Sequence, residues 1–401
     1  MDKRWVIGLS LGTTGDGVDA VLLEIEGVGL QIRVRLVESI FQPHTNDIRT
    51  LLRQITGTET SAKQISLVNR LLGETLAICV NKVVNQAGIH LQTVQCVGCP
   101  GYTLWHEPEH RYPNTLSIGT MAVVAELTGI TTVSDFRSRD LAAGGQGLPL
   151  TVLADHIVFR RKGEHRVLVN LGGIASIVWL PGAAEIRETL GFHCGPCNGL
   201  LDEFMFVLTR GRECYDAWGK HAVQGRCIEE LLQRWIHHPM MQRKPPKGMP
   251  KNAFGEEFVR QALEQARVRQ WTLHDLLCTA THFVAHGVTE AVKNFLPTRP
   301  DRVLLSGGGV RNGLLWRLIE QNLDGIPLST IESEGIPCRS RKAVGFGCLA
   351  ALTIDGCPAN LPAVTGANGS RLLGSITPGS PQNWAQCLHW MSQQTSLLAA
   401  A

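Results

Sequence analysis

The chain lacks several features that would indicate common functional classes. It has no run of 18 uncharged apolar residues and no apolar leader before its first predicted strand, so we expect a cytoplasmic protein that does not span a membrane. It has no run of five Lys or Arg residues and a net charge of only +3, so a nucleic-acid partner has little electrostatic support. The GxGxxG fingerprint of dinucleotide-binding domains is also absent.

Cysteine, by contrast, is abundant. The 401 residues include 12 cysteines, and without an export signal most of them should be reduced and buried. Two CxxC pairs, Cys96 with Cys99 and Cys194 with Cys197, lie too far apart in the sequence for a zinc ribbon. We therefore predict no metal site, and keep as an alternative a variant in which Cys99, Cys194 and Cys197 bind a metal.

Glycine turns organise the rest of the chain, whose length suggests two or three domains. Residues 7–22 and 167–179 each contain an apolar run, a glycine-containing turn and a second apolar run, a pattern that predicts a β-hairpin. A third turn, residues 307–309, follows a predicted strand at 302–306 and precedes a predicted helix at 313–323. Turns of this kind let backbone N–H groups approach an anion. Their repetition predicts a duplicated fold that holds a polyphosphate between two lobes.

Four motifs narrow this prediction, at residues 12–19, 135–150, 170–175 and 360–367. They resemble the anhydro-N-acetylmuramic acid kinases of the sugar kinase, Hsp70 and actin superfamily, whose relatives include levoglucosan kinase. The resemblance implies an α/β fold: a two-lobed, actin-like ATPase with ribonuclease H-like duplicated domains and a cleft between the lobes. We expect lobe one to contain residues 1–138 and 378–401, and lobe two residues 139–377.

The resemblance also implies a reaction, the ATP-dependent hydrolytic ring opening and 6-phosphorylation of 1,6-anhydro-N-acetylmuramic acid in cell-wall recycling. Its partners would be a sugar and a nucleotide, with Mg²⁺ as the metal of ATP; a homodimer is left open. The nucleotide-binding residues implied are Gly12, Thr13, Thr14, Gly15, Asp16, Gly17, Val18, Asp19, Gly172, Gly173, Gly307, Gly308, Gly309 and Asn312. The substrate-binding residues implied are Tyr102, Thr103, Asp135, Arg137 and Lys342.

The base position departs from the family. Phosphorylation requires a base that takes a proton from the attacking oxygen. The family supplies an Asp from the segment Phe-Asp-Thr-Gly-Pro-Gly-Asn, where this chain has His193, with Cys194 and Cys197 replacing the Thr and the second Gly. Imidazole is a common general base, but it offers fewer acceptor sites than a carboxylate, and when protonated it accepts no proton.

Other departures lie on the sugar side and late in the chain. The family's His-Gly-Gln-Thr loop is Pro-Gly-Tyr-Thr at residues 100–103, and Thr120 replaces an Asp. Arg339 and Lys342 replace an Asp and a Glu, which creates a small basic cluster. We therefore predict a divergent member whose activity is lost or altered. The alternatives are a nucleotide-binding pseudokinase, a kinase that uses His193 or a carboxylate such as Asp16, and the cysteine-based metal variant.

The coarse secondary-structure prediction supplies the scaffold. Apolar spacing predicts helices at residues 64–86, 116–128 and 273–296, and another at 384–392. Residues 185–190 are predicted to form a strand, while residues 99–108 and 191–198 are predicted to be loops.

Overall fold

The structure is a computed structural model that describes residues 3–12, 15–56, 60–183, 185–245, 247–250 and 253–398, with side chains described to residue 394. The chain forms two compact units, Met1–Phe159 with Ser340–Ala401 (unit 1) and Arg160–Arg339 (unit 2). These boundaries differ from the predicted lobes, which divided the chain after residues 138 and 377. The reason is that α5 (Val152–Phe159) and α12 (Arg341–Ile354) pack with the elements of unit 1.

Unit 1 is built on a six-stranded sheet in the order β13-β7-β4-β1-β2-β3. The strand β1 pairs antiparallel with β2 and parallel with β4. The strands are β1 (Lys3–Leu11), β2 (Gly17–Glu26), β3 (Arg33–Pro43), β4 (Val94–Gly98), β7 (Thr131–Ser134) and β13 (Ser375–Thr377). A separate hairpin contains β5 (Tyr102–Glu107) and β6 (Asn114–Ile118).

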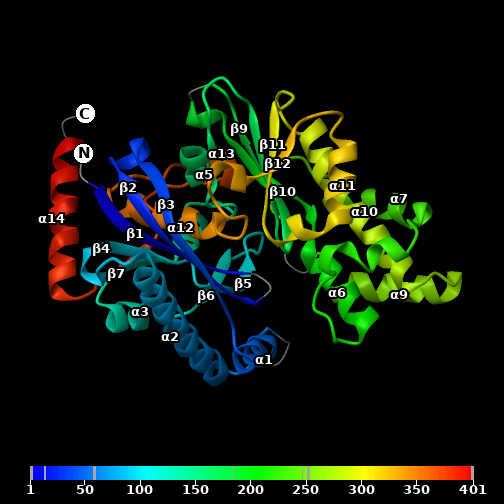
Figure 1. Ribbon diagram of the computed structural model, residues 1–401, viewed down its shortest axis with the longest axis horizontal. Helices are drawn as coiled ribbons and strands as arrows, with labels where there is room; N and C mark the ends of the chain where they lie inside the picture. The colour runs from blue at the N-terminus through cyan, green and yellow to red at the C-terminus, as the bar shows by residue number, and fades with distance from the viewer. Residues whose placement is uncertain are drawn as a thin grey trace. The chain divides into compact units, whose positions relative to one another are not determined.

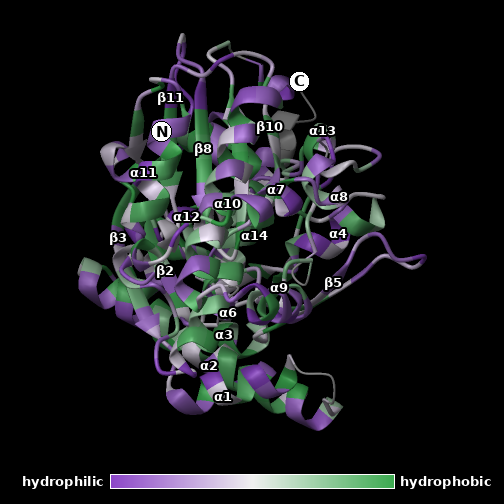
Figure 2. Ribbon diagram, turned by 90° about the vertical axis from the view of Figure 1, so that its right-hand side faces the viewer, coloured by the Kyte–Doolittle hydropathy of each residue, from purple (hydrophilic) through white to green (hydrophobic). Residues whose placement is uncertain are grey.

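The helices described in unit 1 are α1 (Asn46–Ile55), α2 (Ala62–Ala87), α3 (Met121–Thr128), α4 (Phe136–Ala142), α5, α12, α13 (Pro362–Thr365) and α14 (Pro381–Leu398). Of these, α2, α3, α5, α12 and α14 contact strands of this sheet. A Cβ at Gly8 of β1 or Gly98 of β4 would collide with main-chain oxygens of α12, so both glycines permit close packing of this helix. Figure 1 shows α14 beside β4 and β7, and Figure 2 shows hydrophilic and hydrophobic residues alternating along α1 and α2.

Unit 2 has a five-stranded sheet in the order β10-β9-β8-β11-β12. Its strands are β8 (Arg166–Leu171), β9 (Ile174–Leu180), β10 (Leu190–Pro196), β11 (Arg302–Ser306) and β12 (Leu328–Thr330). Its helices are α6 (Asn198–Thr209), α7 (Glu229–Ile236), α8 (Pro239–Gln242), α9 (Glu256–Arg269), α10 (Leu273–Asn294) and α11 (Gly313–Asn322). All six residues of β8 are buried, as expected for the central strand of a covered sheet.

The two sheets repeat one arrangement. In each, an antiparallel three-stranded meander is extended by parallel strands beside its first strand: β4 and β7 beside β1, and β11 and β12 beside β8. The predicted α/β fold with duplicated domains is confirmed by this repetition. No helix in the described part of the chain is long and apolar enough to cross a membrane.

Three predicted boundaries are wrong. Residues 99–108 contain β5 instead of forming only a loop, and residues 116–128 contain the end of β6 before α3. Residues 186–188 form a 3-10 turn, and the strand comes later, at 190–196, where a loop was predicted. Gly191 and Gly195 weakened the strand signal, but pairing with β9 satisfies the backbone.

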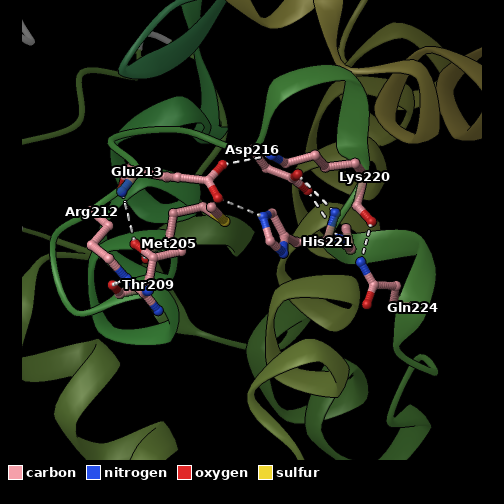
Figure 3. Close-up of polar contacts among 9 residues, drawn as sticks. Met205, Thr209, Arg212, Glu213, Asp216, Lys220, His221 and Gln224 are labelled. Atoms are coloured by element: carbon pink, nitrogen blue, oxygen red, sulfur yellow. Dashed lines mark hydrogen bonds and ion pairs between the residues drawn. The ribbon is translucent and has the colours of Figure 1, made fainter.

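Polar contacts hold the irregular segment after α6 (Figure 3). Glu213 forms ion pairs with Lys220 at 2.7 Å and with His221 at 3.3 Å, the latter when His221 is protonated. The carboxylate of Asp216 accepts hydrogen bonds from the backbone N–H groups of His221 and Ala222, at 2.9 and 3.0 Å. These contacts fix the position of Gly219, which lies beside α11.

Candidate functional site

In unit 2 the fold brings together two of the predicted glycine turns. Asn170 of β8 is paired with Ser306 of the adjacent parallel strand β11. The turns at Gly172–Gly173 and at residues 307–309 therefore follow the carboxyl ends of neighbouring strands. This is where ligands commonly bind in open α/β sheets.

The three glycines of the third turn differ in how much space a side chain would have at each position. Gly307 has φ 87°, and a Cβ there would lie 2.6 Å from the carbonyl oxygen of Leu171. A Cβ at Gly309 would lie 2.7 Å from the Cβ of Leu171. At the exposed Gly308 the nearest atom would be the side-chain nitrogen of Asn198 at 3.6 Å, so its backbone is the most accessible of the three.

Asn198 and Asn312 support these turns. Asn198 donates from its side chain to the carbonyl of Leu171 at 2.9 Å and from its backbone to the carbonyl of Gly172 at 2.9 Å. Asn312 is the N-cap of α11, because its side-chain oxygen accepts from the N–H of Leu315 at 3.1 Å. The nucleotide contact predicted for Asn312 stays a prediction, and its side chain caps α11 in the structure.

In unit 1 the first glycine turn connects β1 and β2. Gly15, at φ 66°, donates to the carbonyl of Gly12 at 3.0 Å, and the carbonyl of Asp16 accepts from the N–H of His44 at 3.0 Å. Gly17 and Val18 are buried in the β2 pairing, whereas Asp16 and Asp19 remain partly exposed. The predicted contacts Thr13 and Thr14 lie outside the described residues.

A cavity of about 320 Å³ lies within unit 1. Its lining includes Pro100, Gly101, Thr120 and Asp135, which are positions on the predicted sugar side. Asp135 has φ 53°, a left-handed conformation that Asp tolerates, and its carboxylate accepts from the hydroxyl of Ser138 at 2.6 Å. Polar walls with a fixed carboxylate can hydrogen-bond a sugar.

Tyr102 and Thr103 are placed differently from Asp135. Neither belongs to the cavity lining among the described residues. Tyr102 is buried in the hydrophobic core of unit 1, and this burial raises the pKa of its hydroxyl. Its ring lies behind the first glycine turn, about 4.0 Å from where a Cβ of Gly15 would be.

Arg137 and Lys342 lie in the same unit, at the start of α4 and of α12. Burial, opposed by Asp135, lowers the pKa of Arg137 to about 10. Burial also lowers the pKa of Lys342 to about 8, helped by the positive charges of Arg341 and Arg137 and opposed by Asp19. Both predicted substrate contacts are therefore cations in a poorly solvated region.

Asp140 has a structural role that the sequence did not reveal. Its fully buried carboxylate accepts from the N–H of Gly147, the amide of Asn360 and the hydroxyl of Thr365, each at 2.8 Å. These bonds hold the glycine-rich loop after α4 against the segment that includes α13.

His193 sits in β10 and is only 8% exposed. The backbone N–H of Met249 donates to the Nδ1 atom of the His193 ring at 2.9 Å. The backbone N–H of His193 donates to the carbonyl of Lys247 at 2.9 Å. A neutral imidazole whose Nδ1 accepts a hydrogen bond carries its proton on Nε2. In this arrangement the ring can donate from Nε2 but has no remaining lone pair to accept a proton.

Lys247, which follows a Pro-rich segment, is buried beside His193. Its ammonium donates to the carbonyls of Met241 at 3.0 Å and Cys194 at 3.4 Å. Burial lowers its pKa. The Pro-rich segment before Lys247 gave no apolar period from which this burial could be read.

The cysteines considered for a metal site are buried. Burial raises the pKa of Cys99 and of Cys194 to about 12 and raises that of Cys197 further, which disfavours the thiolates that bind metals. Among the described residues, no group of three His, Cys, Asp or Glu side chains is arranged to hold a metal ion. The cleft between the units and the metal alternative stay predictions.

Comparisons with known proteins identify the family to which the chain is similar. Residues 4–379 match the family model described as anhydro-N-acetylmuramic acid kinase. The chain is 33% identical over 385 residues to the anhydro-N-acetylmuramic acid kinase of Caldanaerobacter subterraneus subsp. tengcongensis, a match that covers 94% of this chain and 97% of that protein. It is 34% identical over 381 residues to the enzyme of the same name from Gloeobacter violaceus, covering 94% of this chain and all (100%) of the relative.

Solved structures resemble the chain more distantly. One is the activator of the 2-hydroxyisocaproyl-CoA dehydratase from Clostridium difficile with bound ADPNP, at a TM-score of 0.44, 13% identity and coverage of 87% of this chain and 94% of the other. Another is an ROK family glucokinase from Streptomyces griseus, at a TM-score of 0.38, 12% identity and coverage of 86% and 99%.

Proposed function

Because the chain belongs to the anhydro-N-acetylmuramic acid kinase family, we propose that it is a divergent member that binds ATP and a sugar but has lost or altered phosphoryl transfer. The family reaction opens the anhydro ring with water and phosphorylates the 6-oxygen, which requires a base beside the attacking oxygen. In this proposal the protein acts on small molecules in the cytoplasm.

The observation that carries the proposal is the bond between Met249 and His193. His193 stands at the family's base position, and its Nδ1 already accepts the 2.9 Å hydrogen bond from a backbone N–H. Acting as a base would require the ring to exchange its proton between nitrogens and leave that buried N–H without an acceptor. An aspartate at the same position would have lone pairs both for the N–H of Met249 and for the proton of the attacking oxygen.

The residues present fit a nucleotide. Gly308 is exposed, and a Cβ there would meet only the side-chain nitrogen of Asn198 at 3.6 Å, so its backbone N–H is accessible to a phosphate oxygen. Asp16 and Asp19 have the carboxylate oxygens that Mg²⁺ prefers. Bound Mg²⁺ would neutralise charge on the phosphates.

An activity assay tests the proposal. Purified protein is given ATP, Mg²⁺ and 1,6-anhydro-N-acetylmuramic acid, and sugar-dependent ADP release is measured for the wild type, His193→Asp and His193→Asn. We expect weak or no turnover in the wild type and at least a tenfold increase in His193→Asp, since general-base catalysis contributes about 10²–10⁴-fold. His193→Asn is the matched control because it can accept from Met249 but cannot take a proton.

Two results would contradict the proposal. Brisk wild-type turnover that survives in His193→Asn would mean that another group, such as Asp16, is the base and that transfer is intact. If ATP does not raise the melting temperature of the wild type, the proposal that the protein binds a nucleotide is wrong.

A further inference from the structure

Unit 1 contains a second cavity, apart from the one that Asp135 lines. Its volume is about 250 Å³, and its lining is Arg139, Ala142, Ala143 and Arg371. The first three residues come from the end of α4, and Arg371 comes from the segment between α13 and β13. None of the four is among the nucleotide-binding or substrate-binding residues predicted from the sequence. The proposed function therefore leaves this cavity without a role.

No carboxylate belongs to the lining of this cavity among the described residues. The two that are nearest in the sequence are engaged elsewhere. Asp135 accepts from Ser138 at 2.6 Å and lines the larger cavity, and the fully buried Asp140 accepts three hydrogen bonds at 2.8 Å. The guanidinium of Arg139 is exposed and makes no hydrogen bond or ion pair with a described residue, so it is available to a ligand.

Arg371 is held in a defined position on the other side of the cavity. Its backbone N–H donates to the side-chain oxygen of Asn360 at 2.6 Å, and its carbonyl accepts from the N–H of Ala359 at 3.0 Å. Its Nη1 donates to the carbonyl of Ser370 at 2.9 Å and lies 3.0 Å from where a Cβ of Gly369 would be. The missing side chain at Gly369 thus leaves space for the guanidinium.

Hydrogen bonds also join the two elements that carry the arginines. The side-chain amide of Asn360 donates to the carboxylate of Asp140, the residue after Arg139, at 2.8 Å. The backbone N–H of Asn368 donates to the carbonyl of Ala143 at 2.7 Å. The fold therefore keeps two positive side chains at one cavity. Like charges in such a position repel each other, and an anion bound between them would be attracted by both.

We propose that Arg139 and Arg371 form a binding site for a phosphate group, either free or carried by a small metabolite. The planar fork of a guanidinium matches the oxygens of a phosphate. A phosphate monoester carries a charge of about −1.5 to −2 at pH 7, so it balances two arginines better than a carboxylate does. The cavity is smaller than the roughly 300–1,000 Å³ of pockets for drug-sized ligands, which favours a small anion. The site goes beyond the proposed function because it requires neither ATP nor a sugar.

Isothermal titration calorimetry of the full chain tests the site. Inorganic phosphate is titrated at pH 7.5, with chloride keeping the ionic strength constant, and we expect saturable binding to the wild type. A parallel titration with sn-glycerol 3-phosphate distinguishes the two sources, because tighter binding of the ester indicates a metabolite and tighter binding of inorganic phosphate indicates the free ion. Acetate, which carries one negative charge, should bind more weakly than both.

Variants assign the binding to the two arginines. Arg139→Met and Arg371→Met should each weaken phosphate binding by about tenfold or more, since each removes charge-assisted hydrogen bonds. Arg371→Lys keeps the charge without the planar fork and should lose less than Arg371→Met. The matched control is Arg33→Met, which removes an exposed arginine of β3 and should bind phosphate as the wild type does. Both arginines of the site are at least partly exposed, so the variants should keep the wild-type circular dichroism spectrum.

Three results would overturn the proposal: no phosphate binding by the wild type, wild-type binding in both methionine variants, or acetate binding as tight as that of phosphate. Wild-type binding in both variants would place the phosphate elsewhere, for example at the glycine turns. The activity assay is independent of these outcomes. Absence of phosphate binding would leave the account of His193 untouched, and a failure of His193→Asp to gain activity would leave the arginine site untouched.

Discussion

At the scale of single residues, hydrogen bonding decides what His193 can do. The Nδ1 atom of the ring accepts a 2.9 Å hydrogen bond from the backbone N–H of Met249, and the backbone N–H of His193 donates to the carbonyl of Lys247 at 2.9 Å. The ring of His193 therefore provides the hydrogen-bond acceptor for the buried N–H of Met249, which is a structural role. The general chemistry of imidazole allows a base, but the hydrogen bond at Nδ1 places the proton where a base would need a lone pair.

Removing the acceptor should destabilise the protein. In His193→Ala the N–H of Met249 is left buried and unsatisfied, and we expect a loss of about 1–3 kcal/mol in the free energy of unfolding. His193→Asn keeps an acceptor and should lose less. Urea unfolding followed by circular dichroism measures both, and equal losses in the two variants would show that the hydrogen bond is not the stabilising feature.

At the scale of elements, α12 is the helix around which unit 1 is assembled. Its start packs against Gly8 of β1, and its end is fixed by Asp355, which follows the last helical residue. The carboxylate of Asp355 pairs with Arg4 at 2.5 and 2.6 Å and accepts from the indole of Trp390 at 2.8 Å. One buried carboxylate therefore joins β1, α12 and α14.

Breaking this junction should be costly. Asp355→Ala leaves the guanidinium of Arg4 buried without its counter-ion, and we expect a loss of about 3–5 kcal/mol in the free energy of unfolding. The matched control is Arg260→Ala on α9, which removes exposed ion pairs to Glu257 and Glu264 and should leave the urea midpoint nearly unchanged. A loss in Asp355→Ala no larger than the control would contradict this account.

At the scale of the whole molecule, histidines that are buried or partly buried make stability depend on pH. Burial is the largest cause of a lowered pKa for five of them: His44, His106, His238, His282 and His286. Both ring nitrogens of His44 are buried and have no hydrogen-bond partner among the described residues. Each ring is neutral in the folded protein at a pH where the unfolded chain binds a proton.

Stability should therefore fall as the pH falls below about 6.5, the ordinary histidine pKa, because the unfolded state then binds more protons than the folded state. For His106 the loss continues down to a pKa of about 4. Urea midpoints at pH 7.5 and pH 5.0 measure the effect. His44→Asn should reduce it, whereas replacement of the exposed His110 should not; a midpoint that rises at pH 5.0 would contradict the prediction.

Local chemistry was enough to predict much of the scaffold. Apolar runs around Gly15 and Gly172 predicted both hairpins, and apolar spacing predicted the helix that begins at Leu273 as α10, where the side chain of Thr272 accepts from the N–H of Asp275 at 3.1 Å. The motif residues likewise predicted the family that the comparisons show. These features depend on neighbours within a few residues, and such neighbours are visible in a sequence.

What the sequence alone determined is thus the pattern of hairpins, caps and glycine turns, together with the identity of the residue at the base position. Only the tertiary structure decided that residues 247–249 dock on β10 and fix the tautomer of His193, and that the buried Nε and Nη1 atoms of Arg137 have no hydrogen-bond partner among the described residues. The physical reason is that protonation, burial and unpaired charge depend on partners far away in the chain, which no local pattern encodes.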